Sequence, residues 1–143
     1  LYYTIMNLIE LSTDFCQRYL SCLKRASSTL KLTQSQSLCL NAVPFKGISQ
    51  TDLANKLSLD LSTLSRNLDK LSDREFISKK SSSHDKRIIK IYLTDKGENI
   101  YTQLNNLIAN DLYKVFHAFD LDEQDQIEEF LNKINWQFDL LNK

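Results

Sequence analysis

The chain has 143 residues, of which 42% are hydrophobic and 25% charged, and no apolar run is long enough to span a membrane as a helix. Only two glycines and one proline occur, which favours a mainly helical fold and excludes a glycine-rich phosphate-binding loop. The 18 basic and 18 acidic residues balance overall, but residues 1–43, 44–97 and 98–143 carry net charges of +2, +4 and −6, so the cationic middle predicts a surface for an anionic partner.

The first part of the chain predicts two helices. Apolar residues recur at helical spacing over residues 4–26, which predicts one long amphipathic helix. Thr33 and Gln36 have the spacing of a capping box, so a second helix is expected from there to about Val43. The segment from Pro44 to Gly47 then interrupts the helical pattern.

Two short helices follow, and their spacing predicts a helix-turn-helix. Ser49 is positioned to cap the first helix, which is expected to end near Ser58. Asp60 is positioned to cap the second helix, which is expected to extend to about Arg74. The second helix should turn a leucine stripe toward the core: Leu61, Leu64, Leu68 and Leu71.

The periodicity then changes from helical to alternating. Ile89, Ile91 and Leu93 alternate with more polar neighbours, which predicts a half-buried strand over 88–94 paired with a strand over 76–80. The polar segment 81–87 between them is the expected hairpin tip. A hairpin that directly follows a helix-turn-helix is the "wing" of a winged helix-turn-helix.

The end of the chain predicts two long helices. Thr94 is positioned to cap a helix that reaches Phe119, and a last helix is expected from about Glu123 to Leu141. These helices and the first one carry more apolar surface than one small domain can bury, so we expect an isologous homodimer interface. The residues expected there are Tyr2, Tyr3, Ile5, Met6, Leu8, Phe130, Ile134, Trp136, Phe138 and Leu141.

The outward side chains of the second short helix suit double-stranded DNA. Ser62, Thr63 and Ser65 offer hydroxyl groups, and Arg66 and Lys70 offer positive charge. Hydroxyl groups bind phosphates or base edges, and an arginine can grip guanine in the major groove. We therefore expect this helix to be the DNA-recognition helix.

The predicted hairpin tip carries a second candidate DNA contact. Lys86 and Arg87 are cations at the tip, and an arginine on a hairpin fits a narrow minor groove. Asp85 is expected to support the wing by holding Arg87 or a cation of the recognition helix in position.

Taken in order and spacing, these motifs resemble the MarR family of bacterial winged helix-turn-helix regulators. The most specific motifs are Ser62-Thr63-Leu64-Ser65-Arg66, the pair Asp85-x-Arg87, and Leu93-Thr94-x-x-Gly97. The resemblance implies a single domain over 1–143, with dimerisation helices at 1–32 and 98–143 and a winged helix-turn-helix DNA-binding region at 33–97. It also implies a homodimer that binds a palindromic operator, usually as a repressor that a small ligand or an oxidant relieves.

The resemblance extends to individual residues. By resemblance, Arg87 is the minor-groove residue, and the helix of Ser62 to Arg66 lies in the major groove. Family ligand pockets lie beneath the recognition helix, where Tyr19, Leu23, Phe45 and His117 are expected to line a pocket. The sequence differs at position 75, where the family usually has glycine. Because a left-handed conformation is unfavourable for Glu75, the recognition helix is expected to end differently.

The cysteines leave one alternative open. Their odd number and the absence of a secretory signal pattern predict a reduced, cytoplasmic protein. Cys16 and Cys39 lie on apolar stripes and are expected to be buried. Cys22 lies near basic residues at positions 18, 24 and 25, so a thiol-based redox-sensing regulator is the alternative.

Two further alternatives concern the partner and the chemistry. A winged helix can also serve as a protein-interaction module, because a fold alone does not fix function. His84 and His117 lie far apart without metal-ligand spacing, so no metal site and no cofactor are predicted. No nucleophile–base motif is visible, and we expect a protein that is not an enzyme.

Overall fold

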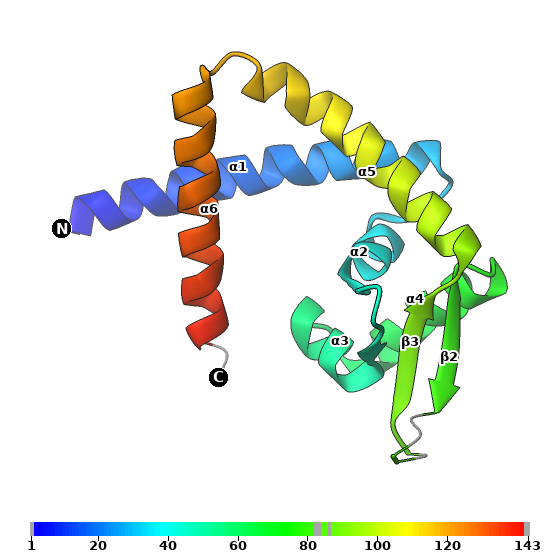
Figure 1. Cartoon of the computed structure of the whole chain (residues 1–143). Helices are drawn as coiled ribbons and strands as arrows, with labels where there is room; N and C mark the ends of the chain where they lie inside the picture. The colour runs from blue at the N-terminus through cyan, green and yellow to red at the C-terminus, as the bar shows by residue number, and fades with distance from the viewer. Residues whose placement is uncertain (1, 82–83, 86, 142–143) are drawn as a thin grey trace. The chain divides into compact units, whose positions relative to one another are not determined.

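The computed structural model describes residues 2–81, 84–85 and 87–141, and in these it has six helices and a small antiparallel sheet (Figure 1). The chain forms two compact units, Leu1–Ile108 and Ala109–Lys143. The predicted mainly helical winged-helix fold class is confirmed. The elements are α1 (Tyr2–Thr29), α2 (Gln34–Ala42), β1 (Ile48–Ser49), α3 (Gln50–Leu57), α4 (Leu61–Asp73), β2 (Ile77–Ser81), β3 (Ile89–Leu93), α5 (Asp95–Phe116) and α6 (Leu121–Leu141).

The predicted helix caps are present. The Thr33 amide donates to Gln36 Oε1 (3.0 Å) and the Gln36 amide donates to Thr33 Oγ1 (3.1 Å), which completes the capping box of α2. Ser49 Oγ accepts from the Asp52 amide (3.0 Å) at the start of α3. At its end, Ser58 adopts a left-handed conformation with φ of 51°. These local interactions explain why the short helices begin and end where the sequence predicts.

The sheet contains one strand more than predicted. Its order is β1-β3-β2 with antiparallel pairing, and β2 and β3 form the predicted hairpin. Ile48 of β1 lies opposite Ile91 of β3. A strand of two residues is too short to show alternation in the sequence, so pattern reasoning could not find it.

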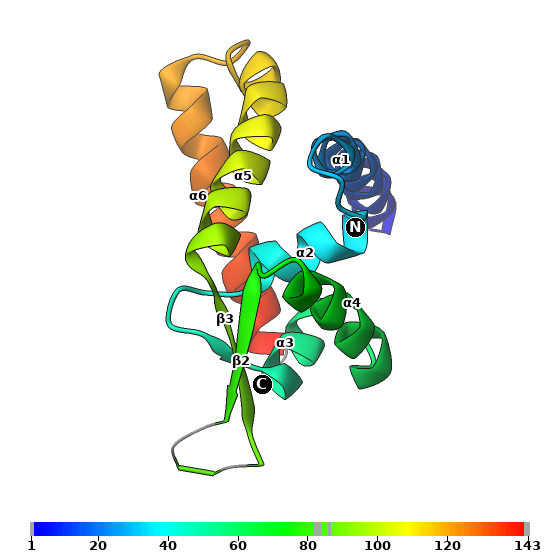
Figure 2. The same cartoon turned by 90° about the vertical axis from the view of Figure 1, so that its right-hand side faces the viewer.

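Side chains from α1 to α5 and from the sheet form the core of the first unit, in which α3 and α4 lie beside the strands (Figure 2). Leu64, Leu68 and Leu71 of α4 are fully buried, as predicted. Leu61 does not join them, because it begins the helix and is 53% exposed, so its predicted inward position is wrong. The buried side chains from the elements around α4 include Leu23, Leu40, Leu53, Ile91 and Leu104.

The end of α4 corrects a second expectation. Glu75 has φ of 62°, so it adopts the left-handed conformation that glycine would favour after the helix end at Asp73. The Phe76 amide donates to the Leu71 carbonyl (2.9 Å), which closes the helix end in the way a glycine would allow. The expectation that this helix ends differently is therefore wrong, and Glu75 adopts the left-handed conformation at a conformational cost.

The second unit contains the end of α5 and all of α6. The Glu123 amide donates to Asp120 Oδ1 (2.8 Å) and the Asp120 amide donates to Glu123 Oε2 (2.9 Å), which forms a second capping box. The helix α5 ends at Phe116, three residues earlier than expected. His117 follows that end, is exposed, and stacks on Tyr113, so its expected place inside a helix is wrong.

Several apolar side chains remain exposed on the long helices. Phe130, Ile134 and Phe138 of α6 are each at least half exposed, and Leu8 and Ile9 of α1 are similar. Cys16 of α1 is also exposed in a single chain, so its expected burial is wrong at this level. Within the described residues, no helix is both long and apolar enough to cross a membrane.

Candidate nucleic-acid interface

The start of α4 is organised by the carboxylate of Asp60. Asp60 Oδ1 accepts from the Thr63 amide (2.8 Å), and Asp60 Oδ2 accepts from Thr63 Oγ1 (2.7 Å). Ser62 Oγ also donates to Asp60 Oδ1 (2.5 Å). The hydroxyl groups of Ser62 and Thr63, followed by the Thr63 amide, hold the pKa of the Asp60 carboxyl well below its ordinary value.

These bonds fix the hydrogen-bonding character of the two hydroxyl groups. Each hydroxyl group has one hydrogen, and in both cases that hydrogen is directed to Asp60. The remaining lone pairs of Ser62 and Thr63 are free to accept from a partner. The start of the candidate recognition helix therefore presents acceptors, which suit the amino groups of adenine and cytosine.

The rest of α4 separates an anchored face from an exposed one. Asn67 Nδ2 donates to Ser35 Oγ of α2 (2.8 Å), which joins the two helices. Arg66 and Lys70 are exposed and lie one helical turn apart, so their cations share the outer face. Ser65 is half-buried beside them. This arrangement leaves the predicted DNA-contacting side chains of α4 accessible from one side.

One acidic residue of α4 is neutralised by the wing. Asp69 Oδ1 lies 2.6 Å from Lys79 Nζ of β2. The pair links α4 to the wing and would reduce the repulsion between Asp69 and an anionic partner. Sequence reasoning missed this contact, because it depends on which face of β2 meets α4.

At the tip of the wing, the structure describes Asp85 and Arg87, whereas Lys86 lies outside the described residues. Asp85 Oδ1 accepts from the backbone amide of Arg87 (2.9 Å), and the Ile88 amide donates to the Asp85 carbonyl (3.0 Å). Asp85 therefore shapes the turn through a hydrogen bond to the backbone of Arg87. The side chain of Arg87 is exposed.

The start of α4 and the wing meet at one cavity. Leu61 and Arg87 both line a cavity of about 530 Å³, together with residues 49–52 and 88–90. The first residue of α4 and the wing arginine thus lie within reach of the same partner. Sequence order alone does not reveal this proximity, because 26 positions separate the two residues.

The junction between the wing and α5 is tightly packed around Gly97. The Thr94 amide donates to the Phe76 carbonyl (3.1 Å), and Thr94 Oγ1 donates to the Glu75 carbonyl (2.5 Å). The Gly97 amide donates to Thr94 Oγ1 (3.0 Å). A Cβ atom at position 97 would lie 1.8 Å from the Phe76 carbonyl oxygen, so this motif requires glycine.

The residues expected to line a ligand pocket differ in their surroundings. Leu23 is fully buried, Tyr19 is half-buried and Phe45 is 74% exposed. Phe45 packs edge-on against Tyr101 of α5, with ring centroids 6.3 Å apart. His117 lies in the second unit. The exposed Phe45 side chain is accessible to a ligand, whereas Leu23 is enclosed by the core.

The cysteines also differ from one another. Burial raises the pKa of the Cys39 thiol to about 11, which disfavours the reactive thiolate. Cys22 is half-buried, and its sulfur accepts from Arg25 Nη2 (3.3 Å). Among the described residues, no group of three or more metal-binding side chains is present.

Known proteins of the MarR family are similar to this chain in sequence and in fold. The MarR family model matches residues 44–89. Wild-type MarR from E. coli in its apo form is 28% identical, with a TM-score of 0.76, over 89% of this chain and 95% of that chain. A mutant E. coli MarR complexed with operator DNA is 28% identical, with a TM-score of 0.72, over 94% of this chain and 97% of that chain. A MarR family protein from Bacillus stearothermophilus is 20% identical, with a TM-score of 0.85, over 96% of this chain and 97% of that chain. At this identity the similarity supports the fold alone.

Proposed function

This chain has the sequence motifs and the winged-helix fold of the MarR family, and on this basis we propose that it is a homodimeric, sequence-specific DNA-binding transcriptional regulator. The observation that carries the proposal is the shared cavity of α4 and the wing, lined by Leu61 and Arg87. The E. coli MarR complex with operator DNA supports DNA as the partner. We expect a palindromic operator, because two-fold symmetry in the protein requires it in the site.

The recognition helix would read the major groove. Arg66 has an exposed guanidinium group that fits the O6 and N7 atoms of guanine. Ser62 and Thr63 would accept from base amino groups, because Asp60 holds their hydrogens. Ser65 and Lys70 would contact phosphates beside the groove. The expected half-site therefore contains guanine next to a base with an exposed amino group.

The wing would reach the neighbouring minor groove. Arg87 supplies the cation, and Asp85 holds the backbone of the turn that carries it. Lys86 is proposed as an additional phosphate contact. Because Leu61 and Arg87 line one cavity, DNA seated on α4 would bring its flank toward the wing.

The homodimer would be formed by the long helices. The exposed apolar residues of α1 and α6 would lose water at an interface, which is the main driving force for association. Light scattering should give twice the 16.7 kDa mass of the chain. Phe138→Asp should reduce the mass toward that of one chain, whereas the surface change Gln126→Asp in the same helix should leave the dimer intact.

Regulation would follow from a change in the separation of the two recognition helices. We propose that the protein is a cytoplasmic repressor, and that a small ligand near Tyr19, Leu23 and Phe45 relieves repression by favouring a state that does not fit DNA. A reporter gene controlled by the operator tests the sign of regulation. Expression that rises when the regulator is deleted supports a repressor, and expression that falls contradicts it.

A redox-sensing regulator is the second candidate, supported by the contact between Arg25 and the sulfur of Cys22. Peroxide should then release wild-type protein from DNA but leave Cys22→Ser bound. Equal responses of the two proteins contradict this candidate.

Binding to the intergenic DNA upstream of the coding region tests the main proposal. Fluorescence anisotropy should show saturable binding that weakens with salt and survives unrelated competitor DNA. If no DNA binds even at low salt, the winged helix is instead a protein-interaction module.

A further inference from the structure

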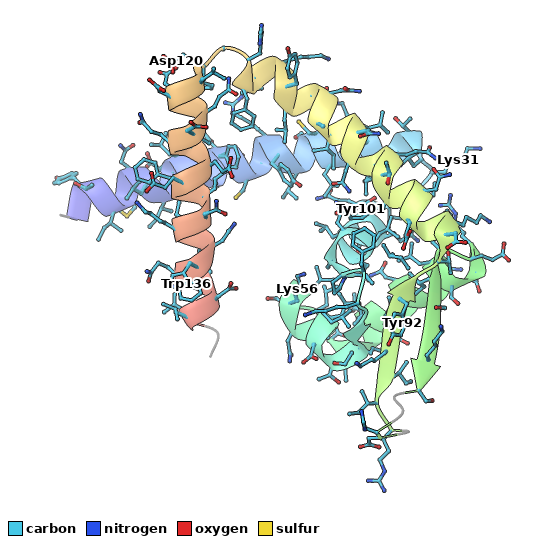
Figure 3. The ribbon with its side chains drawn as sticks, viewed as in Figure 1. Lys31, Lys56, Tyr92, Tyr101, Asp120 and Trp136 are labelled. Carbon is cyan, nitrogen blue, oxygen red and sulfur yellow. The ribbon has the colours of Figure 1, made fainter. Side chains whose placement is uncertain are left out.

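The outer face of the wing places two lysines directly opposite each other. Lys80 of β2 pairs with Lys90 of β3 in the antiparallel register. Side chains in such a pair point to the same face of the sheet. The neighbouring pair on this face is Ser78 and Tyr92, and Tyr92 is labelled on β3 in Figure 3. The opposite face carries Ile77 and Ile91, which are buried in the core.

This pair has an unbalanced charge. Like charges directly opposite each other destabilise a sheet, so the pairing of Lys80 with Lys90 lowers the stability of the hairpin. Among the described residues, neither ammonium group has a carboxylate within ion-pair distance, although Lys79 pairs with Asp69 at 2.6 Å on the other face. Asp52 lines the same cavity as Lys90, but its carboxylate accepts from Ser49 Oγ (2.6 Å) instead.

One of the two lysines is held on this face by an aromatic ring. Lys80 Nζ lies 5.4 Å from the centre of the Tyr92 ring, within the range of a cation–π interaction. This contact restricts the ammonium group to the outer face and lowers the entropy that binding would cost. Lys90 is half-buried, so part of its side chain is already restricted before a partner binds.

We propose that Lys80 and Lys90 together bind one phosphodiester group of the DNA backbone beside the minor groove that Arg87 enters. The proposal rests on the proposed DNA-binding function and adds a contact distinct from those of α4 and the wing tip. A phosphodiester between the two ammonium groups neutralises their repulsion and accepts from both. The contact reads no base, so it strengthens specific and non-specific binding equally.

The double variant Lys80→Gln/Lys90→Gln tests this site. Its binding to a mixed-sequence duplex and to the upstream intergenic duplex is measured by fluorescence anisotropy across a salt series. The slope of log Kobs against log[salt] should become shallower by about 0.9 for each protomer bound, because one phosphate contact per protomer is lost. The thermal midpoint should be unchanged or higher, because the repulsion between the lysines is removed.

A matched control removes the same charge elsewhere. Lys24→Gln/Lys114→Gln changes exposed lysines of α1 and α5, and its slope should stay closer to that of the wild type. If the double wing variant keeps the wild-type slope, or loses no more than the control, the phosphate site is wrong. That result leaves the proposed function intact as long as Arg87→Ala weakens operator binding. If the wild-type protein shows no salt-dependent binding, both proposals fail.

Discussion

Replacing Gly97 with alanine should disrupt the junction between the wing and α5. The added Cβ would lie 1.8 Å from the Phe76 carbonyl oxygen, and ordinary contacts begin at 3.4 Å, so the two backbone segments must separate by about 1.6 Å. The obstacle is backbone rather than a flexible side chain. It also accepts the hydrogen bond from the Thr94 amide, which separation would lengthen.

The size of the effect follows from three contributions. Overpacking costs about 1–3 kcal/mol, and a weakened hydrogen bond costs about 1 kcal/mol more. Alanine in place of glycine within a helix stabilises the folded protein by about 1 kcal/mol. We therefore expect Gly97→Ala to lower the free energy of unfolding by about 2 kcal/mol and the thermal midpoint by about 6 °C.

Circular dichroism measures this change in thermal and urea unfolding. Asn99→Ala is the matched control, because it adds alanine to an exposed position of the same helix and should change the stability by less than about 0.5 kcal/mol. If Gly97→Ala is as stable as the control, the close approach of Gly97 to Phe76 is wrong.

Four further changes test other parts of the account. Arg87→Ala should weaken operator binding by about 1–3 kcal/mol in anisotropy titrations, with the dimer mass retained in light scattering, and unchanged affinity would remove Arg87 from the interface. Glu75→Gly should stabilise the protein slightly, by about 0.5 kcal/mol in urea unfolding, because relief of the left-handed strain exceeds the entropy that glycine loses on folding, and a clear destabilisation would contradict this. Asp60→Ala should lower the thermal midpoint at neutral pH. Because folding lowers the pKa of Asp60, the stability that its carboxylate contributes is present above the ordinary aspartate pKa and is lost as the pH falls through the lowered value. A difference from wild type that already disappears at pH 5 would refute the role of Asp60. Cys39 should resist alkylation by iodoacetamide at pH 8 in the native protein, since burial raises its pKa to about 11, and mass spectrometry showing rapid labelling would contradict its burial.

The helix boundaries could be predicted because they depend on neighbouring residues. Thr33, Ser49 and Asp60 each accept from an amide three residues later, and such caps are visible as short motifs. The hairpin of β2 and β3 was equally accessible through its alternation. Most of the fold therefore follows from local chemistry and periodicity.

Features that depend on distant contacts could not be predicted. The pairing of Lys80 with Lys90 depends on the hairpin register, and the contact between Asp69 and Lys79 depends on the approach of α4 to β2. Glu75 adopts a left-handed conformation that is intrinsically unfavourable for glutamate. Two hydrogen bonds hold it there: Thr94 Oγ1 donates to the Glu75 carbonyl, and the Phe76 amide donates to the Leu71 carbonyl at the helix end. In these places tertiary structure decided the outcome.

The candidate interface was only partly accessible from the sequence. Ser62, Thr63 and Arg66 could be chosen from their residue types and their place in the recognition helix. Only the side-chain geometry shows that both hydroxyl groups donate to Asp60. An aspartate that lies two and three residues before hydroxyl side chains is nevertheless a sequence signal for these hydrogen bonds. Their roles on DNA remain predictions.

The central claim is that the winged helix binds a specific DNA site. A mobility-shift assay with the intergenic DNA upstream of the coding region, across a salt series and with unrelated competitor, tests this most directly. The account predicts a saturable complex that survives competitor and weakens steeply as salt rises. Weak binding that competitor abolishes, together with the same weak binding by Arg87→Ala, would contradict it.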